Sequence, residues 1–385
     1  MLIKNRSIAI VGAGPAGLTL ARLLQLKNLH VKVYERDFDK NARVQGSPLD
    51  MHENSGLAAL RKADLLKQFK EVFRPGADKM LIMNEQAEIL YSDHNTKPDE
   101  AFGSEYFRPE IDRGPLRNML VDALLPETVV WDSHFISMEP HNEGWTIHFK
   151  NGSSVYADLV IAADGANSRL RPYLTPIKPV YSGVIMLEGT VAKQYAPHID
   201  ALVKGGKIMA FGNTKNILLG QKANGDIGFY ASFKANENWA AESGLDFSDN
   251  IQILEWFKTA YPEWNALWHE LIQHAYTPFI PRLIYSMPEQ RWKTKSNLTL
   301  IGDAAHVMPP FAGEGANMAM LDALELSEYL TNATYQTIQE AISDFEVNMY
   351  NRSVNATRKS LENGEKMHSK NALSTMLKFF SAHPS

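Results

Sequence analysis

Three glycines near the N-terminus have the spacing of a phosphate-binding turn. Gly12, Gly14 and Gly17 form G-x-G-x-x-G between an apolar run and a helical pattern. The first glycine permits a tight turn, the second lets a pyrophosphate approach the backbone, and the third lets the helix lie close to the strand. Glu35 ends the next strand, where a carboxylate can accept hydrogen bonds from ribose hydroxyls. The pattern predicts a dinucleotide site; the alternative is a structural glycine-rich turn with Glu35 as a solvated strand end.

Two more acidic residues follow apolar runs that are typical of buried strands. Asp164 precedes Gly165 after LVIAA, and Asp303 follows Gly302 after LTLI. Together with Glu35 they supply several carboxylates for ribose or ribityl hydroxyls. A nicotinamide dehydrogenase would need only the first of these acids.

In order and approximate spacing, these three motifs resemble the aromatic-hydroxylase class (class A) of FAD-dependent monooxygenases. The resemblance covers about residues 6 to 330. Four further segments are similar to the tetracycline-inactivating, TetX-like branch: VYERD at 33–37, PLDMH at 48–52, PEIDRGPLR at 109–117 and GDAAHVMPPFAGEG at 302–315. The resemblance implies that the glycine motif holds the pyrophosphate of FAD, that Asp164 serves both FAD and NADPH, and that Asp303 meets the ribityl chain.

A stiff loop and a helix start follow Asp303. Prolines lack N–H donors and can form a rigid wall beside a flat ring, and a helix N-terminus can stabilise negative charge on a reduced flavin. The alternative is a loop that merely connects strand and helix. By the resemblance, Asp50 also lies near the isoalloxazine ring, whereas the nearby His52 is expected at the surface. The residues predicted around the ring are Asp50, Pro309, Pro310, Gly313, Gly315, Ala316 and Asn317.

Three arginines are predicted near the cofactor. The resemblance places Arg113 and Arg117 beside FAD and Arg36 beside its adenosine part. A spacing of four lets the first two share one helix face. The alternative is a solvated face on which they pair with Asp112 or Glu110.

The resemblance places a substrate pocket between the ring and an inserted sheet. The candidate lining residues are Glu188, Lys207, Met209, Phe211, Phe229, Phe311 and Met367. Apolar residues at such spacing are also typical of a core. Lys207 stands where the tetracycline enzymes have an arginine, so the substrate face departs from theirs while the cofactor motifs are kept.

The periodicity predicts an α/β fold. Helical patterns lie at about 15–27, 54–70, 250–260, 315–330 and 338–365, and strand patterns fill 128–164 and 180–234. We expect a Rossmann-type, para-hydroxybenzoate hydroxylase-like FAD-binding domain with an inserted antiparallel β-sheet domain and C-terminal helices. The predicted limits are 1–175 and 281–335 for the FAD-binding domain, 176–280 for the substrate domain, and 336–385 for the helical segment.

Composition excludes several other classes. The 385 residues include no cysteine, so disulfides, thiolate catalysis and Cys-ligated zinc or iron–sulfur sites are excluded. No His pair has metal-ligand spacing, and we expect no metal. A net charge of −5 gives no reason to expect nucleic acid or an anionic membrane as partner. No segment approaches the roughly 20 apolar residues of a membrane span. We expect a cytoplasmic monomer.

The resemblance implies an NADPH- and FAD-dependent monooxygenase that uses O2. It would hydroxylate an aromatic or polycyclic enol or phenol through a flavin C4a-hydroperoxide, with a tetracycline-type substrate and a role in antibiotic resistance as one version. Alternatives are another FAD-dependent oxidoreductase, such as a halogenase or reductase, or a non-catalytic flavin- or ligand-binding protein. The halogenase signature W-x-W-x-I-P is missing from the sequence.

Overall fold

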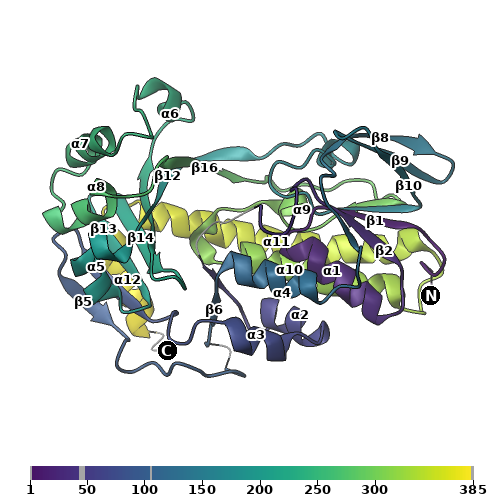
Figure 1. The fold of residues 1–385 in the computed structure, drawn as a ribbon, viewed down its shortest axis with the longest axis horizontal. Coiled ribbons are helices and arrows are strands. Elements are labelled where there is room, and N and C mark those ends of the chain that lie inside the picture. Colours follow the sequence, from purple (N-terminus) through teal and green to yellow (C-terminus); the bar gives the residue numbers. More distant parts are fainter. Residues whose placement is uncertain (1, 43–47, 105, 383–385) are drawn as a thin grey trace.

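The computed structural model describes residues 2–42, 48–104 and 106–382 (Figure 1). A parallel sheet with its helices lies at one end of the molecule, and a larger sheet lies at the other. The long helix α11 (Ile338–Met367) runs along both parts. It begins with a capping box, in which the Thr337 side chain accepts a hydrogen bond from the Glu340 N–H and the Glu340 side chain accepts from the Thr337 N–H.

The parallel sheet has five short strands. In spatial order they are β17 (Leu298–Leu300), β11 (Leu159–Ala162), β1 (Ile8–Val11), β2 (Val31–Tyr34) and β7 (Val129–Val130). Every residue of β1, β11 and β17 is buried, which explains their uninterrupted apolar runs. The carboxyl ends of parallel strands meet at one edge of the sheet. The predicted Gly-rich turn and the three acids at these strand ends therefore meet there.

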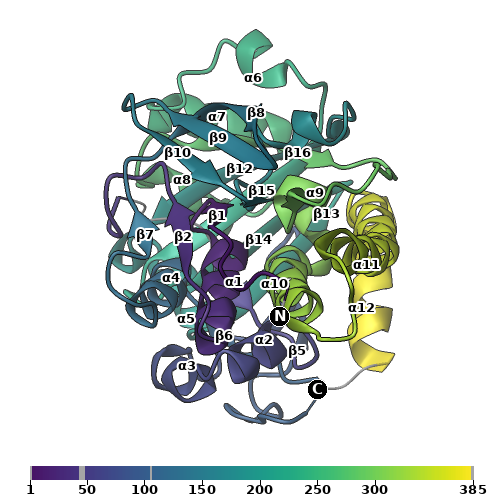
Figure 2. The same cartoon turned by 90° about the vertical axis from the view of Figure 1, so that its right-hand side faces the viewer.

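Helix α1 (Pro15–Leu26) packs against α10 (Gly315–Thr331) (Figure 2). Its side chains Leu18, Leu20 and Leu24 are fully buried. Each contributes about 1.5–3 kcal/mol by leaving water. The two helix N-termini that follow the Gly-rich turn and the Pro-Gly loop are thus held by one core.

The predicted helix at 54–70 is wrong as a single element. The structure has α2 (Gly56–Lys62) and α3 (Leu66–Val72) instead. Asp64 between them adopts the left-handed conformation, with φ +58°, which a continuous helix does not allow. The remaining helices are α4 (Arg113–Asp122), α5 (Pro197–Val203), α6 (Trp239–Glu242), α7 (Asn250–Ala260), α8 (Glu270–Gln273), α9 (Asp303–His306) and α12 (Ala372–Ala382), with short 3₁₀ turns at Arg171–Tyr173, Lys193–Tyr195, Ala266–His269 and Pro310–Ala312.

The larger sheet has seven strands and forms the predicted inserted sheet. In spatial order they are β16 (Ile280–Ser286), β12 (Val180–Val191), β15 (Ile227–Lys234), β14 (Lys215–Gln221), β13 (Lys207–Gly212), β4 (Met80–Asn84) and β5 (Ile89–Ser92). All neighbours are antiparallel except β13 and β4, which pair in parallel. Strands β4 and β5 come from residues 80–92, within the range predicted for the FAD-binding domain. The exact division into domains stays a prediction.

Two small sheets complete the fold. The strands β8 (Phe135–His141), β9 (Gly144–Phe149) and β10 (Ser154–Ala157) form an antiparallel meander, and β3 (Leu49–Asp50) pairs with β6 (Glu110–Ile111). The β3–β6 pairing sets Asp50 opposite Glu110.

The two faces of the seven-stranded sheet pack differently. On β13, Ile208 and Ala210 enter a core shared with α5, α7 and α8, while Met209 and Phe211 enter a separate cluster with α12. This follows from the two-residue alternation of a strand. Phe229 on β15 belongs to the first core. Its predicted place beside Met209 and Phe211 is therefore wrong, because it lies on the opposite face of the sheet.

Candidate active site

The three glycines of the Gly-rich turn differ in what a Cβ atom at each position would contact. A Cβ on Gly12, where φ is +110°, would lie 2.3 Å from the Ala163 carbonyl oxygen. A Cβ on Gly17 would lie 2.0 Å from the Gly12 carbonyl oxygen. A Cβ on Gly14 would meet nothing within 4 Å in the described part of the chain. The first and third glycines thus close the turn against the protein, and the second leaves its backbone open to an incoming group.

Glu35 is buried against the same turn. Its Oε2 accepts the Ala13 N–H at 2.6 Å, and its Oε1 accepts the Asp37 N–H at 3.0 Å. A carboxylate can accept about four hydrogen bonds, so capacity remains for hydroxyl donors. The side chain therefore fixes the turn and can also contact what the turn holds.

Arg117 lies close by but does not pair with Asp112 or Glu110, the alternative that its spacing allowed. Its Nη2 donates to Asp37 Oδ2 at 2.8 Å. The Nε and Nη1 atoms of Arg117 are buried and have no hydrogen-bond partner among the described residues. Arg36 is exposed. The two unused Arg117 donors suit an anionic oxygen from outside the chain.

Asp164 also keeps an unused buried atom. Its Oδ2 accepts the Arg169 N–H at 2.8 Å, whereas Oδ1 has no partner within the described ranges. Burial raises the pKa of Asp164. Arg171 joins this loop to the Asp303 loop, because its Nη2 donates to the carbonyl oxygens of Ala166 and Asp303, both at 2.9 Å. The sequence did not single out this arginine as a link.

A buried acid that the sequence did not reveal holds the Asp303 turn. Asp322 Oδ2 accepts the Gly302 N–H at 2.8 Å and lies 2.6 Å from His306 Nε2, and its Oδ1 accepts Arg352 Nη2 at 2.7 Å. Burial alone would raise the pKa of Asp322, but His306 and Arg352 outweigh it and lower that pKa. Burial raises the pKa of Asp303, although His306 and Arg113 oppose the shift.

These observations fit the predicted FAD. Polar atoms of Arg117 and Asp164 are buried without partners in the described chain, and Gly14 leaves an approach to the backbone. All three lie at the carboxyl edge of the parallel sheet, where a dinucleotide binds in this kind of fold. The first turns of α1 and α10 add backbone N–H groups that have no acceptor within their own helix. The residue types therefore match a long, anionic, hydroxyl-bearing cofactor.

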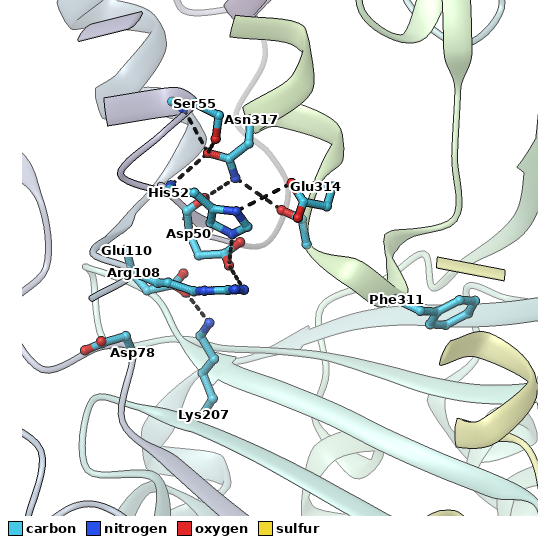
Figure 3. A network of polar contacts seen from close by, with 12 residues as sticks. Asp50, His52, Ser55, Asp78, Arg108, Glu110, Lys207, Phe311, Glu314 and Asn317 are labelled. Carbon is cyan, nitrogen blue, oxygen red and sulfur yellow. Dashed lines mark hydrogen bonds and ion pairs between the residues drawn. The ribbon is translucent and has the colours of Figure 1, made fainter. Parts of the chain in front are cut away.

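Asn317 at the start of α10 holds the Asp50 loop in place (Figure 3). Its side chain is fully buried and is used within the protein. Nδ2 donates to the carbonyl oxygens of Asp50 and Gly313, at 2.8 and 3.2 Å. Oδ1 accepts the N–H groups of His52 and Gly56, at 2.8 and 3.2 Å. Its side chain is therefore a positioning group, which leaves only its backbone N–H for the predicted contact with the ring.

Asp50 lies beside Gly313, and the predicted place of both near a flavin ring stays a prediction. A Cβ on Gly313, where φ is +67°, would lie 3.1 Å from Asp50 Oδ2. Burial would raise the pKa of Asp50, but the bond to His52 and the charges of Lys207 and Arg108 lower it to about 2. Asp50 is therefore an anion at neutral pH.

His52 is not the surface residue that the sequence suggested. Its Nε2 lies 3.0 Å from Asp50 Oδ2, and its Nδ1 lies 3.5 Å from Glu314 Oε2. Burial would lower the pKa of His52, but Asp50 and Glu314 outweigh it and raise that pKa. Only its position two residues after Asp50 could have suggested this contact.

Lys207 on β13 forms an ion pair with Glu110 on β6 (Figure 3). The Glu110 side chain is 1% exposed and the Lys207 side chain 30% exposed. Burial raises the pKa of Glu110 to about 7, against the opposing charge of Lys207. The sequence suggested Glu110 only as a solvated partner for an arginine.

The other predicted substrate residues fall into two groups. Met209, Phe211, Phe311 and Met367 belong to one hydrophobic cluster on the Lys207 face of the sheet. Glu188 lies apart on β12, where its Oε2 accepts Arg282 Nε at 2.7 Å. The loop that carries Phe311 is tied to α11, because Ser360 Oγ donates to the Pro309 carbonyl at 2.5 Å. This bond fixes the loop of the two prolines against α11.

Two kinds of feature are absent from the described residues, a membrane-spanning helix and a metal-binding cluster. No described helix combines the length and apolar content that a membrane crossing requires. No group of three or more His, Cys, Asp or Glu side chains that could hold a metal ion occurs among those residues.

A family model decides the classification. The model described as FAD binding domain matches residues 5–185 and 286–344, which is more than half of the 385-residue chain. The chain belongs to the FAD binding domain family. The gap in the match, 186–285, corresponds to most of the seven-stranded sheet and its helices.

Curated relatives of this FAD-binding chain are monooxygenases. Monooxygenase asqM of Emericella nidulans is 28% identical over 392 residues, covering 87% of this chain and 86% of the relative. The 3-amino-4-hydroxybenzoate 2-monooxygenase PtmB3 of Streptomyces platensis is 28% identical over 380 residues, covering 94% and 88%. The family and these relatives identify the chain as an FAD-dependent monooxygenase, as the motifs predicted.

Solved structures share the fold. A variant of HpxO from Klebsiella pneumoniae complexed with FAD has a TM-score of 0.79 at 21% identity, covering 98% of this chain and 95% of that one. Tetracycline destructase Tet(55) has a TM-score of 0.76 at 17% identity, covering 100% and 98%. The predicted fold class is therefore confirmed, including its likeness to tetracycline-inactivating enzymes.

Proposed function

We propose that this monooxygenase uses NADPH and O2 to hydroxylate a phenol or enol on an aromatic or polycyclic molecule. The observation that carries the proposal is the convergence of three cofactor motifs on one sheet edge, with unused buried atoms on Arg117 and Asp164. We propose that a flat substrate binds between that edge and the side of the seven-stranded sheet that carries Lys207, where Met209 and Phe311 are only partly buried. We further propose that the protein acts as a cytoplasmic monomer.

When bound, FAD would supply both the electron transfer from NADPH and the activation of oxygen. The chain itself binds and orients. The turn around Gly14 receives the pyrophosphate, Glu35 and Arg36 the adenosine part, Arg113 and Arg117 the phosphate region. Asp164 and Asp303 would accept hydrogen bonds from hydroxyls of the ribityl and ribose groups. The backbone N–H groups from Gly313 to Asn317 would donate to the edge of the flavin ring.

The substrate would lie between that ring and the sheet. Met209, Phe211, Phe311 and Met367 supply an apolar wall that limits access of water. Pro309 and Pro310 form a rigid side of the same space. Lys207 supplies a cation at one end of the face. The Glu188–Arg282 ion pair, which joins β12 and β16, would form a polar boundary of the substrate site.

The chemistry of this face favours a substrate with an ionisable oxygen. Lys207 is positioned to bind a phenolate, enolate or carboxylate oxygen. A relative that acts on 3-amino-4-hydroxybenzoate and a fold shared with a tetracycline destructase are consistent with such a substrate. We therefore propose phenolic acids as the first substrate class and tetracyclines as the second.

One experiment tests the function. The purified protein should carry tightly bound FAD, and phenolic acids and tetracyclines should be screened for stimulated NADPH oxidation. Labelled O2 should then appear as one labelled oxygen atom in the product. NADPH oxidation that yields only hydrogen peroxide with every compound would contradict the hydroxylase assignment, and a protein that takes up no FAD would contradict the whole scheme.

A further inference from the structure

The Glu110–Lys207 pair joins the two parts of the molecule at the substrate face. Glu110 lies on β6, which belongs to the FAD-binding part, and Lys207 begins β13 of the seven-stranded sheet. The carboxylate is almost completely enclosed, whereas nearly a third of the lysine side chain is accessible. The lysine side chain is therefore the accessible member of the pair, and the carboxylate is the enclosed one.

Few other charges act on this pair among the described residues. Glu110 is influenced by Lys207, Asp50 and Arg74. Lys207 is influenced by Glu110, Asp50 and the buried Asp78. The negative charge of Asp50 is in turn balanced by the positive charges of His52 and Arg108. With Glu110 ionised, the Lys207 ammonium group is thus paired with Glu110 and is also under the influence of the Asp50 charge.

We propose that Glu110 is a specificity residue which neutralises Lys207 in the free enzyme and becomes protonated when an anionic substrate oxygen binds to Lys207. The inference deepens the proposed function and rests on it for the identity of the ligand. It adds a residue that the cofactor motifs do not include, and it makes anion binding depend on uptake of a proton.

The charge balance explains why the proton is needed. An anion that approaches Lys207 while Glu110 is ionised competes with Glu110 for the same ammonium group and is repelled by that carboxylate. Like charges in a low-dielectric site repel strongly. Because burial already brings the pKa of Glu110 to about 7, protonation at neutral pH requires little free energy.

The step balances simply. The ammonium N–H that points to the Glu110 carboxylate turns to the substrate oxygen, and one proton from solvent bonds to a Glu110 oxygen. No electron is transferred. The proton returns to solvent when the anion leaves. Lys207 keeps its charge in both states: Glu110 and Asp50 raise its pKa in the free enzyme despite burial, and the bound anion replaces the negative charge of Glu110.

The first test follows the Glu110 proton in the FAD-loaded enzyme. The infrared band of its protonated carboxyl is assigned by its loss in Glu110→Gln and titrated with pH, alone, with 4-hydroxybenzoate, and with the uncharged 4-hydroxybenzamide. We expect the midpoint to rise by about one pH unit or more with the anion and to stay unchanged with the amide. No rise with the anion, or an equal rise with both compounds, would overturn the proposal.

The second test measures affinity. The dissociation constant of 4-hydroxybenzoate, read from the flavin absorbance, should increase with pH between the midpoints of the free and the anion-bound native enzyme, by about tenfold in total for a midpoint shift of one pH unit. It should become independent of pH in Glu110→Gln and rise strongly at every pH in Lys207→Met. Lys258→Met, which removes an exposed lysine paired with Glu255 on α7, is the matched control. A pH slope that survives in Glu110→Gln would assign the proton to another group and refute the inference.

These readouts separate the two proposals. Neither the carboxyl titration nor the binding slope requires NADPH oxidation or oxygen incorporation. If the titration behaves as expected but no product is labelled, the proposed hydroxylation fails and the role of Glu110 stands. If the labelled product forms and the Glu110 midpoint does not move, only the inference fails. The midpoints are compared on the native enzyme, and Glu110→Gln is needed only to assign the band. If that variant misfolds, the pH dependence of the native enzyme's affinity for the two probes tests the proposal instead: a dependence equal for both would overturn it.

Discussion

The amide of Asn317 ties Asp50 to Gly313, although the two loops are more than 260 residues apart in the sequence. One Nδ2 group donates to both backbone carbonyl oxygens, at 2.8 and 3.2 Å. The site for the ring edge is therefore formed by two loops that share one buried side chain. The consequence is that loop position and cofactor binding should be lost together.

Replacement of Asn317 by alanine should destabilise the protein. Four backbone groups lose their partner in a buried place, and we expect a loss of roughly 2–4 kcal/mol in the free energy of unfolding. Urea unfolding of the FAD-free protein measures this directly. Asn355→Ala, at an exposed position on α11, is the control and should change stability by less than about 0.5 kcal/mol. Equal stabilities of the two variants would contradict the positioning role.

The glycines of the turn should separate folding from cofactor binding. Gly17→Ala places a Cβ against the Gly12 carbonyl and should cost about 3 kcal/mol, the upper end for overpacking. Gly14→Ala meets no protein atom in the described chain, so its thermal unfolding without FAD should match the native protein. Its FAD affinity should fall at least tenfold, as measured by quenching of flavin fluorescence. Normal FAD affinity in Gly14→Ala would show that the pyrophosphate does not bind at this turn.

Arg117 should matter more for FAD than for the fold. Arg117→Lys keeps a charge near Asp37 but loses the donors Nε and Nη1, which are buried and unpaired among the described residues. We expect the dissociation constant of FAD to rise about tenfold, or ~1.4 kcal/mol. Arg61→Lys, whose guanidinium pairs with Glu53 at the surface, should leave it unchanged. Equal FAD dissociation constants for Arg117→Lys and the native protein would show that the two Arg117 donors face no cofactor atom.

The His306–Asp322 pair should make stability fall on the alkaline side. Burial would lower the pKa of His306, but Asp322 outweighs it and raises that pKa above its ordinary 6.5. The contribution of the pair is therefore fully present below pH 6.5 and is lost as pH rises through the higher folded value. Unfolding free energies of the native protein and His306→Gln, compared between pH 6 and 9, check this. The difference between the two should shrink with rising pH; a constant difference would mean that His306 stays neutral.

Much of the cofactor half could be predicted because its signals are local. The glycine spacing and the three acids at strand ends each lie within a few residues of the strand that positions them, and buried parallel strands give continuous apolar runs. The family match and the fold bear out the predicted FAD-binding class and fold class, whereas the contacts of individual residues with FAD stay predictions.

The partners of the site could not be predicted in the same way. Asp322, Arg352 and Glu110 act through contacts with residues distant in the sequence, and nothing in their neighbours distinguishes them from surface charges. Phe229 was misplaced for a related reason. Alternation shows that a strand has two faces, but only the pairing of β15 with β14 and β12 decides which face reaches the substrate side.

The parallel pairing of β4 with β13 means that the chain enters the large sheet early, leaves it, and returns near residue 180. A separately expressed piece spanning 176–280 would lack β4 and β5. It would leave the backbone N–H and C=O groups on one edge of β13 unpaired. Such a free strand edge invites pairing with other copies, so this piece should precipitate, whereas the intact chain shields that edge. A chimera that takes only residues 176–280 from a relative would combine the relative's β13 with this chain's β4. The pairing between these two strands would then have to form between unmatched sequences.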